Sequence, residues 1–153
     1  MPQLLIVHHT ASPATHELLG AVRSGASAPE IDGVEVVVKA ALEASASDVL
    51  AADGYLLGTP ANLGYMSGAL KHFFDTVYYP CLESTTGRPF GAWIYGNNDT
   101  GGAAAAIEKI TTGLGWRKAQ PILEIMTAPD ADTREQAWEL GATVAALLSG
   151  ALS

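Results

Sequence analysis

Two hydrophobic patterns alternate along the chain, and this alternation limits the folds that it can adopt. Short runs of apolar residues, many of them β-branched and each bounded by Gly, Pro, Asp or polar residues, predict buried strands. These runs span residues 4–7, 34–38, 55–57, 92–95 and 122–125. Between and after them, apolar residues at helical spacing predict helices over residues 13–23, 47–50, 67–77, 103–112 and 133–148. The order predicts an α/β fold: a doubly wound, five-stranded parallel sheet with helices on both faces.

Length and composition narrow the class of protein. The 153 residues suit one domain, spanning residues 1–153, and 48% apolar against 16% charged residues excludes intrinsic disorder. The net charge of −8 argues against nucleic acid and anionic membranes as partners. The single cysteine, Cys81, permits no internal disulfide and suits a reducing compartment. Because the chain also lacks a basic leader and a long apolar run, a cytoplasmic location is expected.

The loop after the first predicted strand, residues 8–16, is the first of three candidate binding segments. In doubly wound sheets, ligands bind beyond the carboxyl ends of the strands. Ser12 is predicted to cap the following helix, whose free amides and positive dipole end attract anions. With the hydroxyls of Thr10 and Thr15 nearby, the segment suits a phosphate monoester, although an ordinary capped helix would need the same residues. Because no Lys or Arg precedes Arg23, an anion here would be held mainly by neutral donors.

The other two candidate segments follow the third and fourth predicted strands. Residues 58–68 carry no charge, and their amides, carbonyls and apolar side chains suit a flat, partly polar ring or, equally, a tightly packed turn. Residues 96–102 contain a glycine pair that permits close backbone approach to a ligand. The polar residues before that pair would also serve to cap the next helix: Asn98, Asp99 or Thr100. The three segments end neighbouring strands, so we expect them to form one site.

The motifs in these segments resemble the flavodoxin-like superfamily and, within it, the NAD(P)H-dependent FMN and quinone reductases. The first segment is similar to the flavodoxin phosphate loop T-x-T-G-N-T at Thr10, Ser12 and Thr15, and departs from it at Pro13 and Ala14. The second resembles the reductase pattern G-[ST]-P-x-x-x-G-x-x-[PS]-G-x-L-K-x-x-x-D. Its matching residues are Gly58, Thr59, Pro60, Gly64, Ser67, Gly68, Leu70, Lys71 and Asp75. The resemblance covers essentially the whole chain and implies the strand order 2-1-3-4-5.

The resemblance also implies bound FMN, with NADH or NADPH as co-substrate. The FMN phosphate would contact the first segment, and the isoalloxazine ring of FMN would lie between residues 60–65 and 96–102. Two aromatic residues are available near the ring, Tyr65 and Tyr95. The cofactor-binding residues carried over are His9, Thr10, Ser12, Ala14, Thr15, Pro60, Ala61, Asn62, Leu63, Gly64, Tyr65, Gly96, Asn97, Asn98, Gly101 and Gly102.

No catalytic side chain is assigned and no metal site is expected. The histidines at positions 8, 9 and 16 lack the carboxylate or cysteine partners of a metal centre. Cys81 is not expected to be catalytic, because it follows a helix and lacks the setting of a phosphatase cysteine. The tryptophans are interpreted as core or interface anchors: Trp93, Trp116 and Trp138.

Two functions are consistent with the resemblance. The first is an FMN-dependent oxidoreductase that takes hydride from NAD(P)H and passes electrons to a quinone, flavin or similar small-molecule acceptor. The second-segment pattern favours this enzyme. The alternative is a flavodoxin-type one-electron carrier, whose net charge of −8 would suit a basic redox protein partner. Relatives commonly form homo-oligomers, so self-association is a further expectation.

Overall fold

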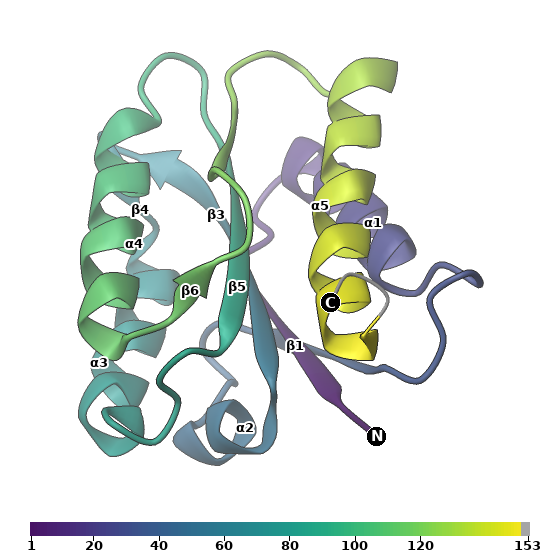
Figure 1. The fold of residues 1–153 in the computed structure, drawn as a ribbon. Coiled ribbons are helices and arrows are strands. Elements are labelled where there is room, and N and C mark those ends of the chain that lie inside the picture. Colours follow the sequence, from purple (N-terminus) through teal and green to yellow (C-terminus); the bar gives the residue numbers. More distant parts are fainter. Residues whose placement is uncertain (151–153) are drawn as a thin grey trace.

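The structure, a computed structural model that describes residues 1–150, contains a central parallel sheet (Figure 1). β2 (Glu35–Ala40), β1 (Gln3–His8), β3 (Gly54–Asn62) and β5 (Pro89–Tyr95) lie side by side in that order. At the far edge, β6 (Arg117–Lys118) and β7 (Leu123–Ile125) both pair in parallel with β5. The predicted flavodoxin-like fold and its strand order 2-1-3-4-5 are confirmed, with the last strand in two pieces.

Two details of the sheet differ from the prediction. The fifth strand was expected as one run over residues 122–125, but the edge is interrupted between β6 and β7. Pro121 lies in that gap and has no N–H to donate to a ladder. Residues 61–66, expected as part of a loop, form a hairpin between β3 and the short β4 (Tyr65–Met66), with Asn62 opposite Tyr65. No clear sequence signal predicts this hairpin, because one of its two turn residues is a leucine.

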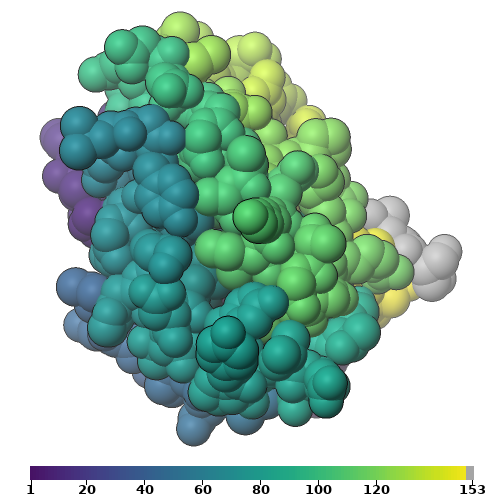
Figure 2. Space-filling view, turned by 90° about the vertical axis from the view of Figure 1, so that its left-hand side faces the viewer, coloured from purple at the N-terminus to yellow at the C-terminus, as the bar shows by residue number. Residues whose placement is uncertain are grey.

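Helices cover both faces of the sheet. α1 (Pro13–Ala26) and α5 (Ala131–Ser149) lie on one face, and α2 (Ala46–Ala51), α3 (Gly68–Cys81) and α4 (Gly101–Leu114) lie on the other. Figure 2 shows α3 and α4, in teal and green, covering much of one side of the molecule. The predicted helices all form, but α2 begins one residue earlier than predicted, at Ala46. Its N-cap is Ser45: the Ser45 side chain accepts from the Asp48 amide, and the Asp48 side chain accepts from the Ser45 amide.

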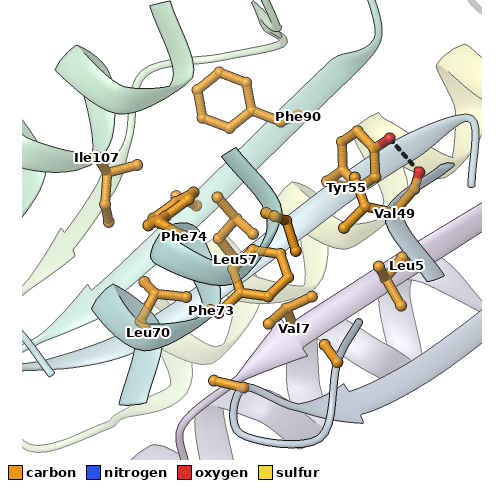
Figure 3. Close-up of a cluster of buried hydrophobic side chains, with 14 of the residues drawn as sticks. Leu5, Val7, Val49, Tyr55, Leu57, Leu70, Phe73, Phe74, Phe90 and Ile107 are labelled. Atoms are coloured by element: carbon orange, nitrogen blue, oxygen red, sulfur yellow. Dashed lines mark hydrogen bonds between the residues drawn. The ribbon is translucent and has the colours of Figure 1, made fainter. Parts of the chain in front are cut away.

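The core consists of two clusters, one on each face of the sheet. Alternate β1 side chains enter different clusters: Leu5 and Val7 pack under α2–α4, whereas Leu4 and Ile6 pack under α1 and α5. Figure 3 shows the α2–α4 cluster, where the Tyr55 hydroxyl donates to the Val49 carbonyl at 2.6 Å.

The predicted tryptophan anchors differ in their surroundings. Trp116 is buried and stacks on Tyr55, with ring centroids 4.0 Å apart. Trp93 is also buried, in the other cluster. Trp138 is 38% exposed on α5 and so belongs to the surface as well as to the packing of the helix.

Glycines allow α1 and α5 to pack backbone to backbone. A Cβ added at Gly141 would lie 2.0 Å from the Val22 carbonyl oxygen, and one at Gly25 would lie 1.9 Å from that of Trp138. No side chain fits at either position without separating the helices. The two helices lie side by side in Figure 1 and fix one wall of the fold.

The sheet register brings the ends of three strands together. His8 at the end of β1 lies opposite Gly58 of β3, and Pro60 of β3 lies opposite Tyr95 at the end of β5. The segments that follow these strands therefore leave the sheet at the same edge. Within residues 1–150, no helix has the length and apolar character needed to cross a membrane.

Candidate functional site

The first segment is closed by its own hydrogen bonds. Ser12 caps α1 by accepting from the Thr15 amide at 3.2 Å, and Thr15 Oγ1 accepts in return from the Ser12 amide at 2.9 Å. The same Thr15 oxygen accepts from the Ala11 amide at 3.1 Å and donates to the Ser12 carbonyl at 2.9 Å. The amides of Ala11 and Ser12 are thus already paired with Thr15, and Pro13 has no amide hydrogen.

Two histidines at the end of β1 have different surroundings. His8 Nδ1 lies 2.8 Å from the Thr10 hydroxyl. Burial and then the neighbouring His9 lower the pKa of His8 below its ordinary value, while Glu43 acts in the opposite direction. His8 is therefore neutral at pH 7. His9 donates its backbone amide to the Gly58 carbonyl at 3.0 Å, but its buried Nδ1 has no hydrogen-bond partner among the described residues.

The second segment is held by two buried hydroxyls. Thr59 Oγ1 donates to the Pro60 carbonyl at 2.8 Å and accepts from the Ser67 amide at 3.0 Å. Ser67 in turn caps α3 by accepting from the Leu70 amide at 3.2 Å. These two residues of the reductase-like pattern therefore tie the two ends of the hairpin together rather than facing a ligand.

The hairpin tip projects an apolar side chain into solvent. Leu63 is fully exposed and has φ of +52°, and Gly64 follows with φ of +72°. Two successive positive φ angles are typical of a two-residue hairpin turn, but a leucine rarely adopts one. Tyr65, the next residue, is also exposed.

The third segment is anchored to β7 and to the hairpin. The Gly96 amide donates to the Ile125 carbonyl at 3.0 Å. Thr100 occupies the N-cap of α4, but its hydroxyl donates to Glu124 Oε1 at 2.7 Å instead of capping the helix. A Cβ at Gly102 would lie 1.8 Å from the Gly64 carbonyl oxygen, so the second and third segments touch there.

A cleft of about 230 Å³ opens where the three segments meet. Six of its lining residues were predicted from the sequence: Ser12, Pro60, Ala61, Asn62, Gly96 and Asn97. Two further lining residues, Ala11 and Tyr95, were not in the predicted set, although Ala11 adjoins Ser12 and Tyr95 was singled out as an aromatic candidate. None of these eight residues carries a formal charge.

The other predicted residues do not line the cleft. Gly64 and Gly102 contact one another and close the gap between their segments. The remaining predicted residues belong to the same three segments but are not among the residues that line the cleft: His9, Thr10, Ala14, Thr15, Leu63, Tyr65, Asn98 and Gly101. Glu124 and Thr59 fix two of the segments and were not recognised as positioning residues, because their bonds depend on the folded geometry.

Three alternatives for a functional site have less support. A larger cavity, of about 340 Å³, lies beside Trp138 on α5, but it is remote from the carboxyl ends of the strands, where such folds bind ligands. Within residues 1–150, no three His, Cys, Asp or Glu side chains are grouped so that they could hold a metal ion. Cys81 is buried, and burial raises the pKa of its thiol, so it is a poor nucleophile.

Comparison with known proteins identifies the family. The sequence model of a family described as NADPH-dependent FMN reductase matches residues 16–133. A flavodoxin of Aquifex aeolicus is 32% identical over 114 residues, which cover 74% of this chain and 60% of that protein. The chain thus matches less than two thirds of that relative's length.

Solved structures agree on the fold. A flavodoxin from the domain Archaea has a TM-score of 0.82 at 18% identity, covering 95% of this chain and 98% of that one. A flavodoxin, WrbA-like protein of Agrobacterium tumefaciens has a TM-score of 0.78 at 19% identity, covering 98% and 99%. At these identities the likeness shows the flavodoxin-like fold alone. Because the family match spans well over half of the sequence, the chain belongs to the NADPH-dependent FMN reductase family.

Proposed function

We propose that the chain binds FMN in the cleft between the three segments and acts as an NAD(P)H-dependent oxidoreductase. The observation that carries this proposal is the cleft itself: six residues expected to bind the cofactor converge there, at the carboxyl ends of β1, β3 and β5. Ligand sites in doubly wound sheets are found at this position. The family match supports the same cofactor.

The residues of the cleft fit the ring end of FMN. An isoalloxazine ring needs apolar cover and a few backbone hydrogen bonds, and the protein's task is to orient it. Ala61 and Tyr95 offer apolar surface, while the uncharged segments around Asn62 and Asn97 offer amides and carbonyls. Gly96 keeps the cleft open, since a Cβ there would lie 3.0 Å from the Ala61 Cβ.

The residues of the first segment fit the phosphate end of FMN less completely than the cleft fits the ring. Ser12 lines the cleft at the start of α1, whose N-terminal dipole favours an anion. Ala14 lies in the first helical turn, and its amide has no acceptor among the described residues. The amides of Ala11 and Ser12, however, already donate to Thr15. We therefore propose that the first segment holds the phosphate with Ser12, Thr10 and the Ala14 amide.

When bound, FMN supplies the ability to accept hydride and to pass its electrons on. In the proposed overall reaction, NADH or NADPH gives up a hydride, which amounts to one proton and two electrons. The quinone or flavin acceptor gains these two electrons and this proton, together with one further proton from the solvent. The chain contributes orientation and cover: the hairpin tip at Leu63 and Tyr65 extends apolar surface beside the cleft, where a nicotinamide and then an acceptor would dock. No charged residue of the lining would trap a second anion there.

A one-electron carrier is the second candidate. The flavodoxin of Aquifex aeolicus, at 32% identity, and the net charge of −8 favour it. Such a carrier would dock a basic redox protein on the face that bears the cleft. It would receive electrons from that protein and not from a nicotinamide.

The two candidates separate in one anaerobic experiment. FMN is added to the purified chain and its visible absorbance is followed, first alone and then with NADPH or NADH. We expect a perturbed flavin spectrum that bleaches within seconds of adding the nicotinamide. A perturbed spectrum without bleaching would favour the carrier, and an unperturbed spectrum would refute both.

A matched pair of glycine variants locates the binding. Gly96→Ala places a methyl group against Ala61 and should weaken FMN binding. Gly20→Ala, on the exposed side of α1 where a Cβ meets nothing within 4 Å, should bind FMN as the wild type does. Equal affinities for the two variants would place the flavin elsewhere.

A further inference from the structure

We propose that Glu124 is a positioning residue for the flavin ring, because its bond to Thr100 holds the third segment in the conformation that shapes the cleft. This inference rests on the proposed function, since it concerns how the ring end of FMN is held. Glu124 itself does not line the cleft. It acts through Thr100, and it opposes the conformation that the start of α4 would otherwise adopt.

β7 holds the third segment at both of its ends. The Gly96 amide donates to the Ile125 carbonyl at 3.0 Å, which fixes the segment where it leaves β5. At the other end, the Thr100 hydroxyl donates to Glu124 Oε1 at 2.7 Å. Glu124 and Ile125 are neighbours on β7, so one short strand sets the path of residues 96–100.

The methyl group of Thr100 packs against the wall of the cleft. A Cβ added at Gly96 would lie 3.1 Å from Thr100 Cγ2 and 3.0 Å from the Ala61 Cβ. Gly96 is thus packed between these two groups, and both Gly96 and Ala61 line the cleft. Because Thr100 is buried, a change in the orientation of its side chain would displace the groups around it.

The start of α4 differs from the start of the other described helices. The N-cap residues of α1, α2, α3 and α5 have extended backbones, and the side chain of each accepts from the amide three residues later: Ser12, Ser45, Ser67 and Asp130. Thr100 has φ of −108° and ψ of −10°, in the helical region, and makes no such bond. Threonine is a favoured N-cap residue, so a local preference is left unused here.

Two arrangements of Thr100 therefore compete. In the observed one, its hydroxyl donates to Glu124. In the alternative, its oxygen would accept from the Ala103 amide, and its backbone would become extended as at the other caps. That change would redirect residues 96–100 beside the ring. A bond to a carboxylate is stronger than a bond between neutral groups, so Glu124 favours the observed arrangement.

The expected effect on affinity follows from the population of each arrangement. A ligand that binds one of two conformations has its apparent affinity reduced by the fraction of chains in that conformation. If loss of the Glu124 carboxylate leaves about 10–20% of chains in the observed arrangement, flavin affinity falls about five- to tenfold. FMN and riboflavin share the ring and should lose affinity by the same factor. The free energy of unfolding should change little, because the cap bond replaces the lost one.

The test is the binding of FMN and of riboflavin to the full chain and its variants, measured by the quenching of flavin fluorescence. Glu124→Ala removes the acceptor and should weaken both flavins by about five- to tenfold. Glu124→Gln keeps an acceptor oxygen and should bind within about twofold of the wild type. Glu108→Ala removes an exposed carboxylate of α4 that pairs with Lys118, and it should leave binding unchanged.

A double variant separates positioning from a general loss of packing. Valine at position 100 keeps the shape of threonine but can neither donate to Glu124 nor cap α4. Adding Thr100→Val to Glu124→Ala removes the competing arrangement, so the double variant should bind both flavins more tightly than Glu124→Ala alone. A purely structural role for Glu124 predicts the opposite, because the second change would add to the first.

A second measurement needs no flavin. In the free chain, the ¹³Cα and ¹³Cβ chemical shifts of Thr100 report its backbone conformation. We expect helical values in the wild type and in Glu124→Gln, and extended values in Glu124→Ala. Helical values in all three proteins would overturn the inference.

The two proposals fail in different ways. If the wild type binds both flavins and Glu124→Ala binds them equally well, the positioning role is wrong and the proposed function stands. The same conclusion follows if Glu124→Gln loses as much affinity as Glu124→Ala. If the wild type binds neither flavin, the proposed function fails and this inference fails with it.

Discussion

Replacing Thr59 with valine tests whether the second segment is held by a buried hydroxyl. Valine has nearly the same shape, so the change removes the hydroxyl and leaves the packing in place. The Thr59 side chain is buried, and the structure gives it two bonds, from the Ser67 amide and to the Pro60 carbonyl. Thr59→Val therefore leaves a buried donor and a part-buried acceptor unpaired.

The expected cost follows from those two groups. Leaving a buried polar group unsatisfied costs about 1–3 kcal/mol, so we expect Thr59→Val to lower the free energy of unfolding by about 2 kcal/mol. For a chain of this length, each kcal/mol shifts the melting temperature by roughly 2–4 °C, which gives about 4–8 °C. The denaturant m-value should be unchanged, because the surface exposed on unfolding is the same.

A matched variant controls for the loss of a threonine hydroxyl. Thr76 donates to the His72 carbonyl on the exposed side of α3, and its replacement by valine should cost less than about 0.5 kcal/mol. Urea unfolding of both variants measures the difference. Because Thr59 holds the hairpin that contributes Pro60, Ala61 and Asn62 to the cleft, FMN affinity should fall in Thr59→Val only. Equal stability losses in the two variants would refute the assigned role of Thr59.

Three further predictions concern helix packing, pH and the cysteine. Gly141→Ala should destabilise the fold by at least about 2 kcal/mol in urea unfolding, because its Cβ would overlap the backbone of α1, whereas Gly20→Ala should be neutral or stabilising. Because the pKa of His8 is lowered in the folded chain, the unfolded chain binds a proton more readily, and the free energy of unfolding should fall as the pH drops below about 6.5. Measured from about pH 8 to 5, the slope of that free energy against pH should be smaller in His8→Asn than in the wild type. Cys81 should react with iodoacetamide at pH 8 only after unfolding, because it is buried and its thiol pKa is raised; rapid labelling of the native chain would contradict this.

The sequence predicted the sheet well because parallel strands are buried on both faces. Residues 4–7 and 55–57 are unbroken apolar runs, and both became central strands, β1 and β3. The edge was harder to predict, since an edge strand needs less burial. There Pro121 lies between β6 and β7, which both pair with β5, and each of these strands is too short to show an alternation of apolar and polar residues.

The candidate site was predicted where local chemistry marks it and missed where distant contacts make it. The capping of α1 by Ser12 follows from a local pattern, and residues 60–62, which line the cleft, lie in a segment whose uncharged, glycine- and proline-rich sequence had marked it as a candidate. The bond between Thr100 and Glu124 joins residues 24 apart, and no local pattern indicates it. The contact between the backbones of Gly64 and Gly102 likewise depends on how two segments meet. Both glycines were predicted to bind the cofactor, but because they contact each other they do not line the cleft.

The central claim, that FMN occupies the cleft between the three segments, is tested most directly by amide chemical shifts. A ¹⁵N-labelled sample is titrated with FMN and the perturbed amides are assigned. The structure predicts the largest shifts in residues 11–12, 61–62 and 95–97, which line the cleft. Small or absent shifts there, with the main changes around Trp138 on α5, would contradict the account and move the binding site to the larger cavity.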